Sequence, residues 1–276
     1  MNRTQNQQTQ ILHALALCAA SAALLLVLPL PLHAAWTPES AARCLEAAYP
    51  ETVRRAEEPG VVLVNGRRVA IGKSMAGRYE QRLDEAGLLD QLEQRYPLDY
   101  AAPAPGRNPG MMRNYPFFDA MYGKTPEEVN ARLVRASWAP AGQKKLRFTR
   151  VNGASRALEA VGREIAAVPA LRRYAARPTA AFEYGKAYGS NRKSVHSYGI
   201  AIDLELPPAV NEYWRRAGCR EGGDCAYPDS LSADPNLKRL VEIFERHGFI
   251  WGGKWRLYDA VHFEYRPELF LDECRQ

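Results

Sequence analysis

The chain has 276 residues, of which 46% are hydrophobic and 25% are charged, and it carries a formal net charge of +6. This ordinary globular composition allows one large domain or two small ones. The positive excess is modest and suits attraction to an anionic polymer or surface, but no basic and aromatic recognition motif accompanies it. We therefore exclude nucleic acid as an expected partner.

Residues 1–35 differ from the rest of the chain. A polar start with a positive charge at Arg3 is followed by a long apolar run and then by small residues before Trp36. This order is typical of a secretory signal peptide, cleaved after Ala34 or Ala35. The alternative is an uncleaved membrane anchor, because the apolar run approaches the length of a span. We expect an exported protein of the periplasm or cell envelope, tethered to a membrane only if this leader is retained.

Five cysteines are present, and four of them lie beyond the leader. An even count in an exported protein indicates disulfides, and three pairings are possible. Cys219 and Cys225 flank a turn-rich loop and favour a local pair, which would leave Cys44 and Cys274 to join the two ends of the domain. The alternative is a zinc–thiolate site, but no CxxC spacing supports it.

Helices and strands are predicted along one continuous domain. In chain order we expect a helix over 37–49, a hairpin over 61–72, a helix over 76–96, an ordered loop over 98–116, a helix over 125–138, a strand over 144–151, a helix over 153–171, an irregular segment over 180–199, a strand over 199–206, a helix over 231–248, and strands and loops from 249 onward. The pair Asn65-Gly66 is a strong hairpin signal, and Thr125-Pro126 is typical of a helix start. The fold class predicted is α+β, a single domain in which a small antiparallel sheet is flanked by helices.

The strand over 199–206 contains an aspartate that needs a partner. Burying a carboxylate costs several kcal/mol unless a cation or hydrogen bonds compensate. Strand alternation places Asp203 on the face opposite to Ile200, Ile202 and Leu204. His196 precedes the strand, and Tyr198-Gly199 permits a turn that folds it back beside Asp203. A metal ion would compensate the charge of Asp203.

Three histidines lie beyond the leader, and two of them stand near carboxylates. His247 ends a helix, where it favours the negative end of the helix dipole. His262 follows Asp259 by three residues and precedes Glu264 by two. Two histidines and one aspartate, with one position open to water, are the composition of a catalytic zinc site, and a further carboxylate would be the general base. Spacing alone is explained equally well by two structural histidines.

Two longer motifs resemble a known family. SVHSYGIAID, residues 194–203, resembles the Ser-x-His-x-x-Gly-x-Ala-x-Asp signature of the zinc D-Ala-D-Ala carboxypeptidase and L-Ala-D-Glu endopeptidase family. WGGKWRLYDAVHFEYRPEL, residues 251–269, resembles the second signature, Trp-Gly-Gly-x-Trp followed by Asp-x-x-His-Phe-Glu. The family includes the vancomycin-resistance carboxypeptidases and several phage endolysins. The resemblance covers about residues 180–270, and the two signatures follow one another in the same order as in the family.

The resemblance implies roles for individual residues. His196, Asp203 and His262 would bind Zn²⁺, and Asp259 would be the catalytic carboxylate. Ser194 would lie near the substrate. Glu264 is the alternative base. We favour for it a role in contact with a predicted ligand, or a position on the surface of the strand. The domain would then consist of an N-terminal helical and hairpin part, residues 36–179, and a zinc peptidase core, residues 180–276.

One departure from the family concerns a cation. Relatives carry an arginine upstream of the first signature, and Gly185 occupies the aligned position here. The catalytic cation that polarises the scissile carbonyl or binds substrate would then be Lys186, Arg192 or a residue outside the motif. A lysine ammonium lacks the bidentate fork of arginine, so the substrate contacts would differ from those of relatives.

Aromatic residues of the two motifs are candidates for the cleft wall. Trp251 and Trp255 flank Gly252-Gly253, where the backbone can approach a ligand closely. Tyr198 and Tyr258 could line the same cleft. The alternative for all four aromatic side chains is packing in the core. We take Ser194, Tyr198, Trp251 and Trp255 as the substrate-binding candidates.

The expected function is that of an exported, monomeric, zinc-dependent peptidase. By the resemblance it would hydrolyse peptide bonds in peptidoglycan stem peptides, first as a D-Ala-D-Ala carboxypeptidase. An L-Ala-D-Glu or other peptidoglycan endopeptidase is the alternative within the family. A non-catalytic cell-wall-binding module and a zinc peptidase with another substrate are alternatives of other classes.

Overall fold

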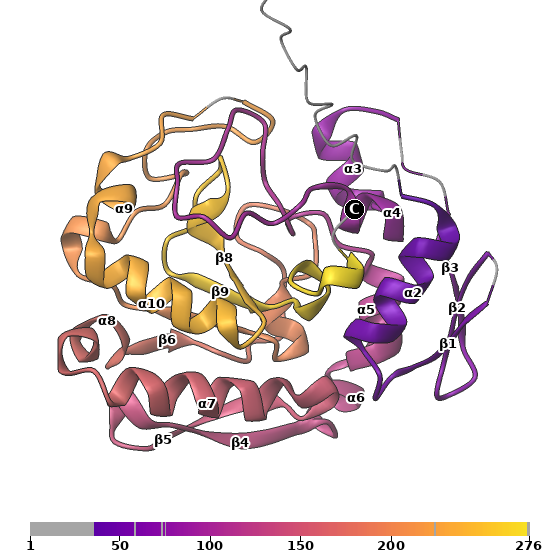
Figure 1. Cartoon of the computed structure of the whole chain (residues 1–276), viewed down its shortest axis with the longest axis horizontal. Helices are drawn as coiled ribbons and strands as arrows, with labels where there is room; N and C mark the ends of the chain where they lie inside the picture. The colour runs from indigo at the N-terminus through magenta and orange to yellow at the C-terminus, as the bar shows by residue number, and fades with distance from the viewer. Residues whose placement is uncertain (1–35, 58, 73, 75, 224, 275–276) are drawn as a thin grey trace, which may run out of the picture. The chain divides into compact units, whose positions relative to one another are not determined.

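The computed structural model describes residues 36–274 except residues 58, 73, 75 and 224 (Figure 1). The predicted leader, residues 1–35, lies outside the described residues. No helix in the part of the chain that is described is long and apolar enough to cross a membrane. The described residues form one compact unit, which contains both segments predicted as parts of a single domain.

A four-stranded antiparallel sheet holds the two motifs on neighbouring strands. Its strands lie in the order β6 (Pro178–Ala180), β7 (Ala201–Leu204), β9 (His262–Tyr265) and β8 (Phe249–Trp251). The β7–β9 register pairs Asp203 with His262 directly. Two motifs that are about sixty residues apart in the sequence therefore meet on adjacent strands.

Helices pack against this sheet through an apolar core. The chief ones are α7 (Ala154–Ala166) and α10 (Pro235–Arg246), which contact each other, and α10 also packs on β8 (Figure 1). Phe244 of α10 stacks on Phe263 of β9 with ring centroids 3.8 Å apart. The predicted fold class, α+β with a small antiparallel sheet flanked by helices, is confirmed.

The helix predicted over 125–138 is only partly correct. Thr125 caps a short helix, α6 (Pro126–Asn130), and the chain then enters β4 (Leu133–Trp138). Strand β4 pairs with β5 (Lys144–Thr149) along its whole length, and this hairpin packs on α7. Pairing with the neighbouring strand β5 outweighs the helix propensity of Leu133, Arg135 and Ala136.

The helix predicted over 76–96 is broken in two. Helix α3 (Tyr79–Glu85) ends at Ala86, and α4 (Leu88–Glu93) begins after Gly87. The Gly87 N–H donates to Asp90 Oδ2 at 2.8 Å, which caps the second helix. The loop predicted over 98–116 gives way to helix α5 (Tyr115–Tyr122), which the sequence analysis did not predict.

The N-terminal part holds a helix and a three-stranded sheet. Helix α2 (Pro38–Ala48) is followed by β1 (Val53–Glu57), β2 (Gly60–Leu63) and β3 (Arg68–Ala70). The hairpin predicted around Asn65-Gly66 is confirmed as the β2–β3 turn, in which Gly66 has a φ of 81°. The remaining short elements are α8 (Arg172–Ala175), α9 (Asp229–Ala233) and 3₁₀ turns at Ala139–Ala141, Val151–Gly153, Pro169–Leu171, Val195–Tyr198, Pro208–Val210, Gly252–Lys254, Pro267–Leu269 and Asp272–Cys274.

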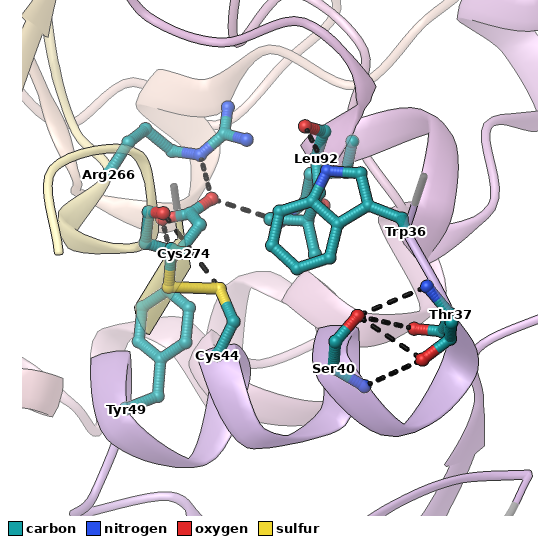
Figure 2. The surroundings of a disulfide bond; sticks show 10 residues. Trp36, Thr37, Ser40, Cys44, Tyr49, Leu92, Arg266 and Cys274 are labelled. Atoms are coloured by element: carbon teal, nitrogen blue, oxygen red, sulfur yellow. Dashed lines mark hydrogen bonds and ion pairs between the residues drawn. A yellow bond between two sulfur atoms is a disulfide. The ribbon is translucent and has the colours of Figure 1, made fainter. Parts of the chain in front are cut away.

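Two disulfides confirm the favoured pairing. Cys219 pairs locally with Cys225, and Cys44 of α2 pairs with Cys274 across 230 residues of chain. Figure 2 shows Cys274 joined to Cys44 on α2, one helical turn beyond Ser40, which closes a capping box with Thr37. This long-range bond ties helix α2 to the turn Asp272–Cys274.

Candidate active site

Three side chains from separate elements converge at one end of the sheet. His196 lies in the turn Val195–Tyr198, Asp203 lies on β7, and His262 begins β9. One donor atom from each lies within 4.8 Å of the other two. Gly199, with a φ of 65°, lets the chain reverse from the turn into β7, which brings His196 back beside Asp203. The structure therefore brings together the three residues predicted as metal ligands.

Hydrogen bonds orient the two imidazoles toward the aspartate. His262 Nδ1 lies 2.9 Å and His196 Nε2 lies 3.2 Å from the same oxygen, Asp203 Oδ1. His196 Nδ1 lies 2.9 Å from the carbonyl oxygen of Ala181. A carbonyl accepts from an N–H, so Nδ1 donates to Ala181, and Nε2 is the ring nitrogen that faces Asp203 and the centre. A backbone partner of this kind is typical of metal-binding histidines.

The electrostatics of the metal-free centre are dominated by burial and by these contacts. Burial raises the pKa of Asp203, but the hydrogen bonds from His196 and His262 outweigh it and hold that pKa well below its usual range. Burial lowers the pKa of His262, whereas Asp203 and Glu264 raise it to about 10. A proton on His262 thus compensates Asp203 when no metal is bound, and a metal would have to displace that proton.

The donor set fits a zinc ion. Two imidazole nitrogens and one carboxylate oxygen, with a further position left for water, are the ligands of a catalytic zinc site. Nitrogen and oxygen donors from His and Asp also suit other transition metals. His196, Asp203 and His262 are the residues that would hold the ion.

Asp259 lies beside these three residues with one oxygen unsatisfied. Its carboxylate is buried, and among the described residues Oδ1 has no hydrogen-bond partner. Burial raises its pKa to about 6. Its backbone is fixed by the N–H, which donates to the Gly252 carbonyl at 3.0 Å. A Cβ on Gly252 would lie 2.6 Å from the Asp259 carbonyl oxygen, so only glycine permits this approach.

Glu264 lies on the other side of His262 in an opposite environment. Arg113 binds both of its oxygens, with Nε 3.0 Å from Oε1 and Nη2 2.5 Å from Oε2. Arg266 Nη1 lies 3.3 Å from Oε1, and His262 Nε2 lies 3.5 Å from Oε2. Burial raises the pKa of Glu264, but Arg113 and the other partners outweigh it and hold that pKa well below its usual range. Glu264 is therefore an anion behind the ligand His262, away from Asp259.

A cleft of about 460 Å³ opens onto these residues. Of the predicted site residues, the cleft wall includes Lys186, Arg192, Ser194, His196, Asp203, Trp255, Asp259 and His262. The Ser194 hydroxyl accepts from the His196 N–H at 3.3 Å, so it also shapes the turn that carries the first histidine. The indole N–H of Trp255 donates to the Pro109 carbonyl at 2.7 Å, which leaves the ring to form the wall.

Two substrate-binding predictions are corrected. Tyr198 is fully buried, and its hydroxyl donates to Asp119 Oδ1 at 2.8 Å. Trp251 stacks on Tyr100 with ring centroids 5.7 Å apart, and its indole N–H donates to the Ala260 carbonyl at 2.7 Å. Neither side chain lines the cleft, so both support it from the core. Other side chains of the core already cover both rings, which leaves no surface for a ligand.

The two predicted catalytic cations, Lys186 and Arg192, differ in whether a carboxylate of the protein binds them. Arg192 Nη1 lies 2.9 Å from Asp84, and Nη2 forms an ion pair with Glu221. Its charge is therefore already compensated within the protein. Lys186 is exposed, and its ammonium donates to the neutral amide of Asn191 at 3.0 Å. Lys186 remains the freer of the two to meet a substrate.

Sequence reasoning missed three groups at the site. Arg113 and Arg215 line the cleft from segments without motif or periodicity, and the Ala181 carbonyl orients His196. No spacing rule connects Arg113 to Glu264, which lies 151 residues later. These contacts follow from tertiary folding alone.

Two comparisons with known proteins match the part of the chain that holds the site. Residues 188–265 match the sequence model described as D-alanyl-D-alanine carboxypeptidase. The chain is also 30% identical over 82 residues to the peptidoglycan L-alanyl-D-glutamate endopeptidase CwlK of Bacillus subtilis (strain 168). That alignment covers 29% of this chain and 44% of the relative, so the chain spans less than half the length of the relative that it matches.

The matched segment contains the predicted ligands His196, Asp203 and His262, together with Asp259. The resemblance stated from the two motifs is thus confirmed by an independent match over the same residues. Residues 188–265 are therefore similar in sequence to the D-alanyl-D-alanine carboxypeptidase family, and this match includes all four residues.

Proposed function

We propose that this protein is an exported zinc peptidase that hydrolyses peptide bonds in peptidoglycan stem peptides, acting as a D-Ala-D-Ala carboxypeptidase. The observation that carries the proposal is the convergence of His196, Asp203 and His262 beside a buried carboxylate with a free oxygen. A buried, uncompensated carboxylate next to three metal-binding side chains is costly as mere structure and useful as a base. The family match supplies the substrate class.

In the proposed mechanism the chain positions water and moves one proton. A zinc ion held by the three ligands would act as a Lewis acid, bringing the pKa of water to about 7 and polarising the scissile carbonyl. Asp259 accepts the proton of the attacking water at its carboxylate. It then delivers that proton to the nitrogen of the leaving amine. Burial, which raises the pKa of Asp259 to about 6, favours both halves of this transfer near neutral pH.

Glu264 has a different task in this proposal. Its two oxygens are held by Arg113, and one of them accepts from His262 Nε2. The imidazole is thereby fixed with Nδ1 toward the centre. A carboxylate bound by two arginines cannot take a proton readily, so Glu264 positions the ligand and does not act as the base.

Export is also part of the proposal. Two disulfides within the described residues support it, because such bonds persist in oxidising compartments outside the cytoplasm. The leader composition of residues 1–35 points the same way.

An L-Ala-D-Glu endopeptidase is the second candidate, favoured by the relative from Bacillus subtilis, whose name gives that activity. Both proposed activities would use the same catalytic centre, and they differ in which peptide bond of the stem peptide is hydrolysed. The choice between them depends on how the cleft holds residues on either side of the bond.

The test is a digestion of synthetic stem peptides that end in D-Ala-D-Ala, with products identified by mass spectrometry. Zinc-loaded protein should release one terminal alanine, and a chelator or the His262→Ala variant should reduce release to background. Cleavage between L-Ala and D-Glu would establish the second candidate. If no stem peptide is cleaved by the zinc-loaded protein, the proposed function is wrong.

A further inference from the structure

The arginines and lysines of the cleft differ in their partners. Arg113 pairs with Glu264, Arg192 pairs with Asp84 and Glu221, and Lys193 pairs with Asp119. Each of these charges is compensated by a carboxylate of the protein. One guanidinium of the cleft wall, that of Arg215, has no carboxylate partner among the described residues.

The Arg215 side chain is held in place, although its charge is uncompensated. Its guanidinium lies over the ring of Trp214, 4.3 Å from the centroid. Nη2 lies 3.5 Å from the Gly189 carbonyl, at the long limit of a hydrogen bond. A Cβ on Gly189 would lie 3.0 Å from both Cζ and Nη1 of Arg215, so the loop at Gly189 packs tightly on the guanidinium. This clamp removes freedom that a surface arginine usually keeps.

The donors of Arg215 are also incompletely used. Its Nε is buried and has no hydrogen-bond partner in the described part of the chain. The neighbouring phenol of Tyr213 does not compensate the charge, because burial raises its pKa and keeps it neutral. A buried donor without an acceptor costs free energy in the protein, and the terminal nitrogens of this half-exposed guanidinium are the donors that a ligand can reach.

Backbone pairing fixes this segment beside the proposed base. Tyr213 forms a β-bridge with Asp259, and the Trp214 N–H donates to the Tyr258 carbonyl at 3.0 Å. Arg215 therefore follows directly from a segment anchored to Asp259. If Asp259 protonates the leaving amine, the residue that departs with that amine lies on the Arg215 side of the cleft.

We infer that Arg215 binds a carboxylate of the substrate, on the residue that follows the scissile bond. This inference rests on the proposed function and adds a specificity determinant to it. A guanidinium offers two parallel N–H donors that match a carboxylate. Two sources of that carboxylate exist in the proposed substrates, the chain terminus of a D-Ala-D-Ala peptide and the free carboxylate of a D-glutamate residue.

The test compares paired substrates that differ only in this group. One pair ends in D-Ala-D-Ala as the acid or as the amide, and the other contains D-Glu or its carboxamide after L-Ala. The wild-type protein should prefer the acid of the pair that it cleaves by about 10- to 100-fold in kcat/KM, the worth of a charge-assisted hydrogen bond. The pair that shows the preference identifies the source of the carboxylate.

Variants then assign the preference to Arg215. Arg215→Gln should raise KM for the acid by about 10- to 100-fold and abolish the preference over the amide, while zinc affinity stays unchanged. Arg215→Lys should restore part of the preference, because it keeps the charge but loses the fork. The matched control is Arg220→Gln, which removes the same charge from an exposed position of the same segment outside the cleft wall and should leave both pairs unaffected.

Equal cleavage of acid and amide by the wild-type protein, or an unchanged preference in Arg215→Gln, would overturn the inference. A binding measurement separates it from the proposed function. Calorimetric titration with the dipeptide D-alanyl-D-alanine and with its amide requires no turnover. Binding of the acid alone, lost in Arg215→Gln, supports the inference even if no peptide is cleaved, and equal binding of the two forms contradicts it.

Discussion

Asp259 and Glu264 flank the same histidine on one short segment, yet their surroundings are opposite. Asp259 is half-buried and forms no ion pair with an arginine of the described residues; its Oδ1 is buried and accepts no hydrogen bond there, and its pKa is raised to about 6. Glu264 is fully buried, but Arg113 and Arg266 hold its pKa well below the usual range. The pKa values of these two carboxyl groups, which lie five residues apart in the sequence, are thus shifted in opposite directions.

Under the proposed function, this difference would separate a proton carrier, Asp259, from a positioning residue, Glu264. A group that must gain and lose a proton needs a pKa near the working pH, whereas a group that orients a ligand must keep its charge. Four experiments can break or sharpen the comparison.

The largest effect is expected for Asp259→Asn. An amide cannot accept the proton of water, so kcat should fall by about 10²- to 10⁴-fold, the usual contribution of a general base. The measurement is turnover of the stem peptide at saturating zinc, with the unfolding midpoint as the check on folding. Near-normal turnover would contradict the assignment and make Glu264 the better candidate for the base.

A smaller loss is expected for Glu264→Gln. Residues that orient a metal-binding histidine typically contribute about 10- to 100-fold to metal affinity or activity. Turnover should fall at limiting zinc and recover substantially at high zinc, because the base is intact. A fall in kcat that excess zinc does not reverse would show that Glu264 takes part in the chemistry.

The effects on stability differ in sign between the two carboxylates. Burial raises the pKa of Asp259 from its unfolded value of about 3.9 to about 6, so the folded state disfavours the charge above about pH 4. In the metal-free protein Asp259→Asn should therefore raise the free energy of unfolding by about 1 to 3 kcal/mol at pH 8 and leave it unchanged at pH 3.

Glu264 should behave in the opposite way. Its lowered pKa contributes stability that is present above about pH 4.3 and is lost as the pH falls. Glu264→Gln should cost about 3 to 5 kcal/mol at pH 7, because it leaves buried arginines without this partner. Chemical denaturation of both variants at pH 3 and pH 8 is the measurement, and shifts of the same sign at pH 8 would contradict the comparison.

The convergence of His196, Asp203 and His262 was predictable because each residue lies in a local pattern. Strand alternation oriented Asp203, Gly199 allowed the reversal after His196, and the second motif supplied His262. Asp203 and His262 lie opposite each other because the two motifs stand on adjacent antiparallel strands, β7 and β9. The hairpin at Asn65-Gly66 was predictable for the same reason, since a two-residue turn signal is local.

The errors have local causes, whereas the omissions have long-range ones. Residues 133–138 form a strand because β5, the next strand along the chain, pairs with them, and the helix predicted over 76–96 breaks where Asp90 caps a new helix at Gly87. Tyr198 has the motif position of a cleft residue but faces the core, where it contacts Asp119. Arg113 and Arg215 reach the site from segments whose sequence gives no periodic signal, so only the fold reveals them.

The most direct test of the account is the zinc affinity of Asp259→Asn and Glu264→Gln, measured side by side by competition with a chromophoric chelator. The account predicts that Asp259→Asn binds zinc as tightly as the wild-type protein and that Glu264→Gln binds it about 10- to 100-fold more weakly. The reverse order, with weakened binding in Asp259→Asn and wild-type affinity in Glu264→Gln, would contradict the roles assigned to the two carboxylates.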